Sequence, residues 1–217
     1  MYLTFDTETT GLPKNYSAPI SETDNWPRMV QIAWQINDKS GNLISSESHI
    51  IKPKGYTIPF NAEKIHGIST QKAIDKGKEI KYVLEKFNNE LKKNKYIIGH
   101  NINFDVNILG SEFYRSKIKT SLLEKESIDT GLISKEFCQL EGGLGGKLKM
   151  PKLIELYNIL FESDFSDAHD ARADVNATAK CFFELMKRKV FETEESKLTD
   201  IKYEGVEIKE SNFKKKK

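Results

Sequence analysis

The stretch YLTFDTETTG, residues 2–11, begins as an apolar run and ends with two carboxylates, Asp6 and Glu8, one residue apart. Residues i and i+2 of a β-strand point to the same face, so these side chains are expected to project side by side. Two like charges this close are unfavourable unless they share a cation. The stretch therefore predicts a metal platform; the plainer alternative is a strand that ends in a polar turn at Gly11-Leu12-Pro13.

Composition bounds the class of protein. The chain has 217 residues, enough for one α/β domain, with 38% hydrophobic and 30% charged residues. The net charge is only +2, so bulk charge does not indicate nucleic-acid binding. Cys138 and Cys181 lack metal-ligand spacing and are interpreted as free thiols of a reducing compartment. Since no run is apolar enough to span a membrane, we expect a soluble, cytoplasmic protein.

Hydrophobic periodicity predicts an alternation of strands and helices. A proline-rich loop is expected over residues 13–27. The expected strands are 2–5, 29–36, 43–51 (hairpin-linked to the one before), 96–99 and one ending at 128–129; the expected helices cover 83–91, 104–114, a segment with Pro151 in its first turn, and 171–186. Three strands followed by strands alternating with helices indicate an α/β fold with a mixed sheet covered by helices.

The last part of the chain differs in composition. Residues 187–217 contain ten Lys or Arg and seven Asp or Glu, a net charge of +3. We expect residues 1–186 to form the folded domain and 187–217 a charged C-terminal extension, with a marginal hairpin around 201–208 and a Lys-rich end. A phosphate-backbone contact or a docking segment is the alternative to a solvated tail.

Two further segments carry candidate site residues. Asp105 follows an apolar strand and falls in the first turn of the next helix, at the strand end where α/β sites usually lie; favourable interaction with the helix dipole is the alternative. Asp174 lies about one helical turn after His169, so both could face one cleft. The neighbouring Asp167 and Asp170 are interpreted as N-caps.

The combination of segments resembles the His-containing branch of the DEDD 3′–5′ exonucleases, the RNase H-like group that includes bacterial DNA polymerase III proofreading subunits, RNase T and oligoribonuclease. The matching segments are FDTETTG, RMVQIAW, IHGIST, GHNINFD, IDT and AHDARADVNATA, which run from Phe5 to Ala179 in the family's order. The resemblance implies an RNase H-like fold with a mixed five-stranded sheet flanked by helices. It leaves out the chain beyond about Met186 and much of the proline-rich loop.

The resemblance also implies the site residues. Asp6, Glu8, Asp105 and Asp174 would be the metal-binding carboxylates and His169 the catalytic base. His100 would have a structural role or support the metal ligands from behind. The expected cofactors are two Mg²⁺ ions, with Mn²⁺ able to substitute, because hard cations prefer oxygen ligands and compensate the charge of four carboxylates. Histidine suits the role of base because its ordinary pKa lies near neutrality.

Substrate contacts follow from the same resemblance. It implies that Thr9, Thr10, Gly11 and Leu12 bind the terminal nucleotide, with Leu12 wedged against its base; ordinary turn packing is the alternative for Leu12. His66 and Asn101 are assigned to the substrate side as well. For His66 the residues alone favour a position next to a helix C-cap at Gly67. Asp129 is interpreted as a strand-end or capping residue.

The function predicted is metal-dependent 3′–5′ exonuclease activity that releases nucleoside 5′-monophosphates from single-stranded or frayed 3′ ends, with DNA favoured and a proofreading or repair role. An RNA-trimming or oligoribonucleotide-degrading enzyme is the alternative within the class. A non-catalytic nucleic-acid or polymerase-binding subunit is the alternative of another class, and the presence of all five catalytic-type residues counts against it. Proofreading would require a polymerase partner; the oligomeric state is not predicted.

Overall fold

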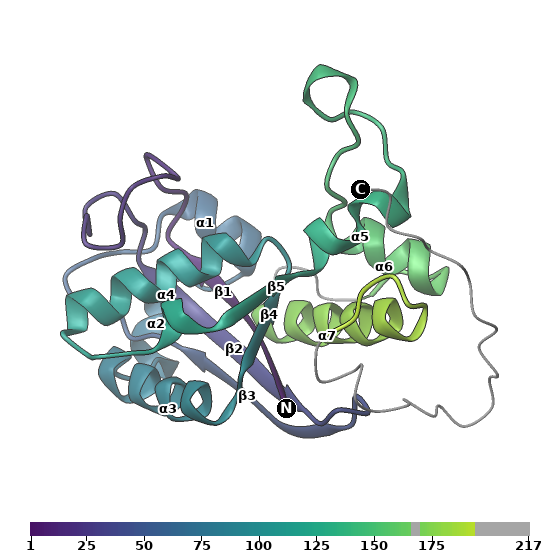
Figure 1. The fold of residues 1–217 in the computed structure, drawn as a ribbon. Coiled ribbons are helices and arrows are strands. Elements are labelled where there is room, and N and C mark those ends of the chain that lie inside the picture. Colours follow the sequence, from purple (N-terminus) through teal and green to yellow (C-terminus); the bar gives the residue numbers. More distant parts are fainter. Residues whose placement is uncertain (166–169, 194–217) are drawn as a thin grey trace.

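The computed structural model describes residues 1–165 and 170–193. Its centre is a five-stranded mixed sheet with the strand order β3-β2-β1-β4-β5 (Figure 1). The strands are β1 (Tyr2–Thr9), β2 (Met29–Asn37), β3 (Leu43–Ile50), β4 (Tyr96–Gly99) and β5 (Glu126–Asp129). The first three strands pair antiparallel, and β1, β4 and β5 run parallel to one another. This confirms the predicted mixed sheet and its hairpin, although β1 is longer than the segment predicted.

Helices cover both faces of the sheet (Figure 1). They are α1 (Phe60–His66), α2 (Thr70–Lys76), α3 (Ile80–Lys93), α4 (Ile102–Ser116), α5 (Thr130–Cys138), α6 (Leu153–Phe161) and α7 (Ala171–Lys187), with short 3-10 turns η1 (Leu122–Glu124) and η2 (Leu144–Gly146). Among the described residues, no helix has the length and apolar character needed to cross a membrane.

The central strand β1 separates two parts of the core because its side chains alternate between faces. Leu3 and Phe5 pack with α3 and α4 in the larger cluster, whereas Tyr2 packs with Phe182 of α7. The odd-numbered face of β1 therefore contacts α3 and α4, and the even-numbered face contacts α7. Asp6 and Glu8 belong to the α7 face.

A β-bulge interrupts the pairing of β1 and β2 near the end of β1. Glu8 pairs with Gln31 and Thr9 with Met29, so Val30 is the extra residue. The side chain of Val30 packs with α1 and α2 in a separate cluster instead of joining Ile32 and Trp34. Regular alternation would place Val30 on the same face as these two residues, and the bulge accounts for the difference.

Two helices, α2 and α5, were not predicted, and of α1 only the C-cap at Gly67 was. One predicted boundary was also wrong, since Pro151 does not lie in the first turn of a helix. Lys152 is the N-cap of α6 with an extended backbone, and its N–H donates to Glu155 Oε2 at 2.8 Å. The helix therefore begins two residues after Pro151. The Gly67 C-cap of α1 is confirmed, with φ 68°.

The packing of the domain continues beyond α7. Phe191 packs against the cluster that contains Tyr2, and the Tyr2 hydroxyl is hydrogen-bonded to Thr193 Oγ1 at 2.8 Å. The predicted hairpin around 201–208 and the Lys-rich end lie outside the described residues. The division into a domain of residues 1–186 and an extension stays a prediction.

Candidate active site

The end of β1 and the start of α7 bring three carboxylates together. In the β1–β2 pairing, Asp6 lies opposite Ala33, and Ala33 packs against Ala171 and Val175 of α7. These small side chains allow the first turn of α7, which carries Asp174, to lie close to the sheet. Asp174 therefore reaches the face of β1 from which Asp6 and Glu8 project.

The three carboxylates are spaced for a shared cation. One oxygen each from Asp6, Glu8 and Asp174 lies within 4.8 Å of the others, and all three residues are half-buried. Oxygen ligands on opposite sides of one ion lie about 4–5 Å apart, given metal–oxygen bonds of about 2.1 Å for Mg²⁺ and about 2.5 Å for Ca²⁺. The arrangement and the all-oxygen donor set thus fit a hard divalent cation.

The electrostatics of these carboxylates also favours a bound cation. Burial raises the pKa of Glu8 to about 8, with further contributions from the charges of Asp174, Asp105 and Asp170. The pKa of Asp6 is also raised well above its ordinary value, first by burial and then by the charges of Asp105, Asp174 and Glu8. The ionised carboxylates repel one another in the metal-free fold, and a bound cation would relieve that repulsion.

Asp105 approaches from the other side of β1. It is buried in the first turn of α4, and its Oδ1 accepts hydrogen bonds from Thr7 N at 2.9 Å and Thr7 Oγ1 at 2.6 Å. Burial raises the pKa of Asp105 to about 7 even though the two bonds from Thr7 act against the shift. Asp105 lies outside the three-carboxylate cluster, but its charge acts on Asp6 and Glu8.

The residues after Glu8 form a turn at the edge of the cluster. Thr9 is buried, and its hydroxyl donates to the Gly11 carbonyl at 2.6 Å. Thr10 exchanges two bonds with Arg28: its N–H donates to the Arg28 carbonyl at 2.9 Å, and its Oγ1 accepts from the Arg28 N–H at 3.0 Å. Leu12 ends the turn with 73% of its surface exposed, which leaves an apolar side chain available for contact with a substrate.

His66 and Asn101 have different surroundings. His66 is buried, and its Nδ1 accepts from Ile68 N at 3.1 Å. Burial lowers its pKa, and the Thr9 backbone beside the ring partly opposes the shift. His66 therefore lies next to the turn that was assigned to the substrate. Asn101 is the exposed N-cap of α4, with its N–H bound to Asp129 Oδ1 at 3.0 Å.

His169, the predicted base, lies outside the described residues, as does Asp167. His100 has the structural contacts expected of it: Nδ1 lies 3.0 Å from Thr130 Oγ1, and Nε2 lies 2.8 Å from the Pro151 carbonyl. The capping interpretations also agree with the structure. Asp170 accepts from Arg172 N at the start of α7, and Asp129 accepts from Gly131 N and Leu132 N at the start of α5.

Two contributors to the site were not predicted. Thr7 donates two hydrogen bonds to Asp105. The sequence feature that could have indicated this contact is a threonine between Asp6 and Glu8, whose side chain points to the opposite face of β1. Asp170 was interpreted only as a cap, but its charge contributes to the raised pKa of both Asp6 and Glu8. Its position directly before a helix that carries Asp174 was the corresponding signal.

The Thr7→Val variant tests how Asp105 is held. Valine keeps the shape of threonine but removes the hydroxyl that donates to Asp105 Oδ1. Because a hydrogen bond to a charged group is worth about 1.5–3 kcal/mol, we expect the free energy of unfolding to fall by that amount at pH 8 in EDTA. Urea unfolding measures it.

Thr4→Val is the matched control for Thr7→Val. Thr4 lies on the same strand, and its buried Oγ1 has no hydrogen-bond partner among the described residues. Replacing an unpaired buried hydroxyl by a methyl group is expected to be neutral or stabilising. Equal losses in both variants would contradict the role given to Thr7.

The fold and the site define a class: an α/β domain with an acidic, metal-type site at the end of its central strand. The sequence model of the RNase T family, an exonuclease family, matches residues 3–182, and the chain belongs to this family. The prediction of a DEDD-type exonuclease domain is thereby confirmed, whereas membership of the His-containing branch stays a prediction. Among curated proteins, none matches the chain in sequence.

Solved structures share the fold. Escherichia coli exonuclease I in complex with a dT13 oligonucleotide is 24% identical, with a TM-score of 0.69 over 87% of this chain and 41% of that chain. A second exonuclease I structure, described as suggesting how processivity is achieved, gives 23% identity and a TM-score of 0.69 over 87% and 42% of the two chains. The complex of the Escherichia coli enzyme with dA16 gives 22% and 0.68 over 88% and 42%.

These likenesses confirm the predicted RNase H-like fold. The chain spans about two-fifths of the length of the exonuclease I structures that it matches.

Proposed function

We propose that this protein is a metal-dependent 3′–5′ exonuclease that releases nucleoside 5′-monophosphates from single-stranded or frayed DNA ends. The observation that carries the proposal is the cluster of Asp6, Glu8 and Asp174, whose oxygens lie within 4.8 Å of one another. Membership of an exonuclease family and the fold shared with exonuclease I support it.

Each carboxylate has a part in the proposed reaction. Asp6, Glu8 and Asp174 would hold divalent cations, for which we propose Mg²⁺ with Mn²⁺ as a substitute, and Asp105 would complete the set from the α4 side. Bound cations of this kind activate water and stabilise the charge on the attacking and leaving oxygens. The donors from Thr7 keep Asp105 in place while the site is loaded.

His169 would take the proton from the attacking water. The water oxygen forms a bond to the phosphorus of the last phosphodiester, and the bond from phosphorus to the 3′-oxygen of the preceding nucleotide breaks. The 3′-oxygen receives a proton and becomes the new chain end, and the departing nucleotide carries the 5′-phosphate. His100 is unsuited to the role of base because both of its ring nitrogens are engaged by Thr130 and Pro151.

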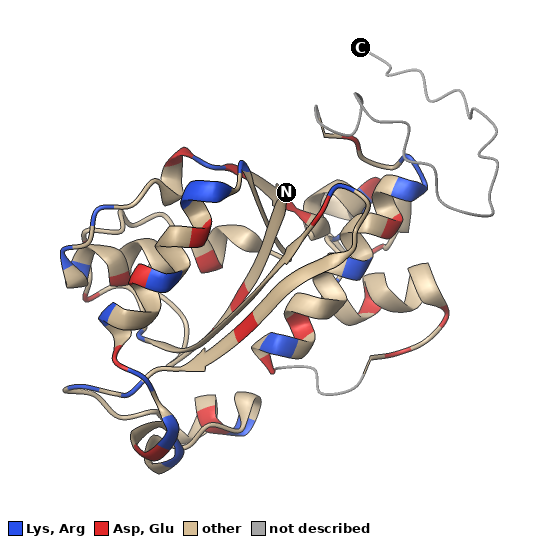
Figure 2. Cartoon of the chain, turned by 90° about the horizontal axis from the view of Figure 1, so that it is seen from below, with Lys and Arg blue, Asp and Glu red and all other residues tan. Residues whose placement is uncertain are grey.

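The choice of DNA rests on the structural neighbours, whose complexes contain single-stranded DNA oligonucleotides. Bulk charge does not help, because the net charge is +2 and Lys and Arg are scattered over several helices and loops (Figure 2). Rates on single-stranded DNA and RNA of the same sequence and length test the choice. Faster release from DNA supports it, and faster release from RNA would make the protein an RNA-trimming enzyme.

A partner polymerase is a separate part of the proposal. A proofreading role predicts that a purified polymerase of the same organism co-elutes with this protein and that mismatched 3′ ends are cut faster than matched ones. A stand-alone repair or degradation role predicts no such complex.

The Leu12→Ala variant tests the proposed wedge. Since Leu12 is 73% exposed, the change should leave the fold intact. Contacts against a base face are worth about 1–3 kcal/mol, so we expect release from blunt duplex ends to fall about fivefold or more, with a smaller loss on single strands. Rates on both substrates measure this effect.

Leu144→Ala is the matched control, because Leu144 is 96% exposed in the loop between α5 and α6. It should affect neither substrate. Equal losses on duplex and single-stranded DNA in Leu12→Ala would argue against the wedge.

A further inference from the structure

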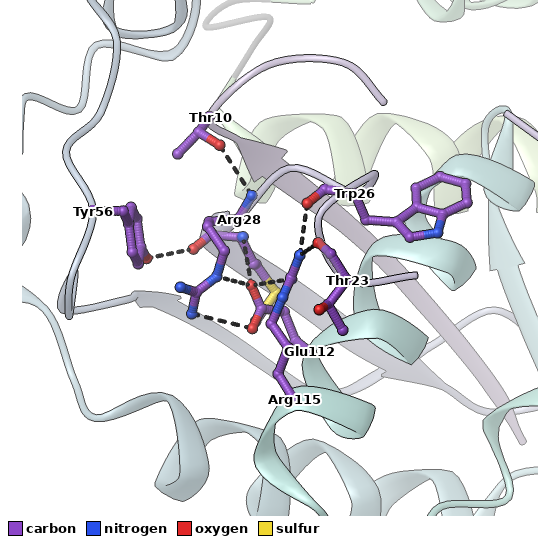
Figure 3. A network of polar contacts seen from close by, with 8 residues as sticks. Thr10, Thr23, Trp26, Arg28, Tyr56, Glu112 and Arg115 are labelled. Atoms are coloured by element: carbon purple, nitrogen blue, oxygen red, sulfur yellow. Dashed lines mark hydrogen bonds and ion pairs between the residues drawn. The ribbon is translucent and has the colours of Figure 1, made fainter. Parts of the chain in front are cut away.

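A cluster of charges around one buried carboxylate adjoins the turn that follows Glu8 (Figure 3). Glu112 of α4 has a side chain with 0% exposure, and its carboxylate accepts from Arg28 Nε at 2.7 Å and Arg28 Nη2 at 3.3 Å. Arg115 Nη1 forms an ion pair with Glu112 Oε1 at 3.0 Å. The two arginines come from segments more than eighty positions apart in sequence.

Further contacts surround the carboxylate of Glu112 and the guanidinium of Arg28. Met29 N also donates to Glu112 Oε1, at 3.2 Å. The Arg28 guanidinium lies over the ring of Tyr56, 4.3 Å from its centroid, and the Tyr56 hydroxyl donates to the Met29 carbonyl at 3.1 Å. A buried carboxylate needs all of its partners, because losing one leaves an uncompensated buried charge. The groups around Glu112 are therefore held as a unit.

The cluster fixes both ends of the segment that links β1 to β2. At the end nearer β2, Arg115 Nη2 donates to the carbonyls of Thr23 and Trp26, the latter at 2.6 Å. At the end nearer β1, Thr10 exchanges two hydrogen bonds with the backbone of Arg28. Thr10 lies two residues after Glu8. Figure 3 shows this chain of contacts from Arg115 through Glu112 and Arg28 to Thr10.

The frame for these contacts is α4. Asp105 and Glu112 lie seven residues apart, which places them on one face of the helix two turns from each other. Asp105 contacts Thr7 on β1. Glu112 contacts Met29, the first residue of β2, and Arg28 directly before it. The two contacts are separate, so the second can be removed while the first remains.

We infer that Glu112, Arg28 and Arg115 are positioning residues for the segment Thr9–Leu12. They hold the proposed grip on the 3′-terminal nucleotide at a fixed place beside the metal-type carboxylates. None of the three is assigned a contact with the reacting atoms. The inference rests on the proposed function, since it supposes that Thr9–Leu12 binds the substrate.

Glu112→Gln and Arg28→Lys test the inference in the full chain. The first keeps the shape of the side chain and removes its charge; the second keeps the charge and removes the forked pair of donors. For both, we expect KM for a single-stranded DNA oligonucleotide to rise about tenfold with little change in kcat, the pattern of lost uniform binding. Mn²⁺ affinity should match the wild type, because the contact between Asp105 and Thr7 is retained.

Lys86→Gln is the control. It breaks an ion pair with Glu47 at the sheet edge, outside this cluster, and should leave KM and kcat unchanged. All rates are measured below the melting temperature of every variant, so that loss of folded protein does not contribute. Arg28→Lys keeps the inference testable if Glu112→Gln fails to fold.

Dissociation constants for the same oligonucleotide, measured by fluorescence anisotropy in EDTA, give a readout that needs no hydrolysis. A parallel rise in KM and the dissociation constant in both variants supports the inference. Unchanged values, or a fall in kcat alone, would overturn it. If the wild type binds Mn²⁺ but releases no nucleotide, the proposed function fails, and the ratio of dissociation constants still decides whether the cluster positions a nucleic-acid grip.

Discussion

Replacing Asp6 with Asn is expected to abolish nucleotide release and to raise the melting temperature of the metal-free protein. Asp6 is one of three carboxylates within 4.8 Å, so the change would remove one of the proposed metal ligands. Mutating a residue that only hydrogen-bonds to a metal ligand lowers metal affinity or activity about 10–100-fold. Because Asp6 is itself a proposed ligand, we expect its replacement to lower activity by about 10³-fold or more.

The stability of Asp6→Asn should move in the opposite direction. Burial and the charges of Asp105, Asp174 and Glu8 raise the pKa of Asp6, so its ionised form is unfavourable in the metal-free fold. The neutral amide removes that cost at pH 8. A gain of about 1 kcal/mol corresponds to about 2–4 °C in Tm for a domain of this size. Thermal unfolding in EDTA measures it.

Mg²⁺ completes the test of Asp6→Asn. A bound cation stabilises the wild type by about 2.7 kcal/mol at a hundredfold excess over Kd, and the variant should lose most of this gain. Asp75→Asn, on the exposed surface of α2, is the control and should behave as wild type. An Asp6→Asn protein that keeps its activity and is stabilised by Mg²⁺ as strongly as the wild type would contradict the site.

Replacing His169 with Ala is expected to lower turnover by about 10²–10⁴-fold, the usual contribution of a positioned general base. Metal binding should be retained, because the proposed ligands are the carboxylates. Single-turnover hydrolysis of single-stranded DNA and Mn²⁺ titration measure the two properties separately.

His49→Gln is the control for His169→Ala, since His49 lies on β3 next to Glu47 and outside the site. Its turnover should be unchanged. Equal turnover of His169→Ala and wild-type protein would contradict the role of His169 as base. The proposed metal site of the carboxylates would be unaffected by that result.

The sequence predicts the central part of the fold because local periodicity determines it. The apolar run of β4 and the helical spacing of Val83, Leu84, Phe87 and Leu91 in α3 correspond to buried residues of the structure. Periodicity did not indicate α1 or α2, because seven residues give barely two turns. Of these two helices, only the end of α1 was predicted, from the cap at Gly67. The long loop between β1 and β2 was predicted, but the burial of its residues Ala18 and Trp26 in the core was not.

The candidate site likewise has features that local sequence predicts and features that depend on tertiary packing. The i, i+2 spacing of Asp6 and Glu8 was readable because strand geometry alone places both on one face. The approach of Asp174 depends on the packing of Ala171 and Val175 against Ala33, and no local pattern specifies that contact. The link between Thr7 and Asp105, and that between Arg28 and Glu112, join residues far apart in sequence, so only the fold shows them.

Product analysis on a 5′-labelled single-stranded DNA oligonucleotide with Mg²⁺ tests the account most directly. We expect the wild type to shorten the oligonucleotide one nucleotide at a time from its 3′ end, to release nucleoside 5′-monophosphates and to stop when EDTA is added, while Asp174→Asn leaves it intact. Shortening from the 5′ end, release of 3′-monophosphates, or equal cleavage by wild type and Asp174→Asn would contradict it.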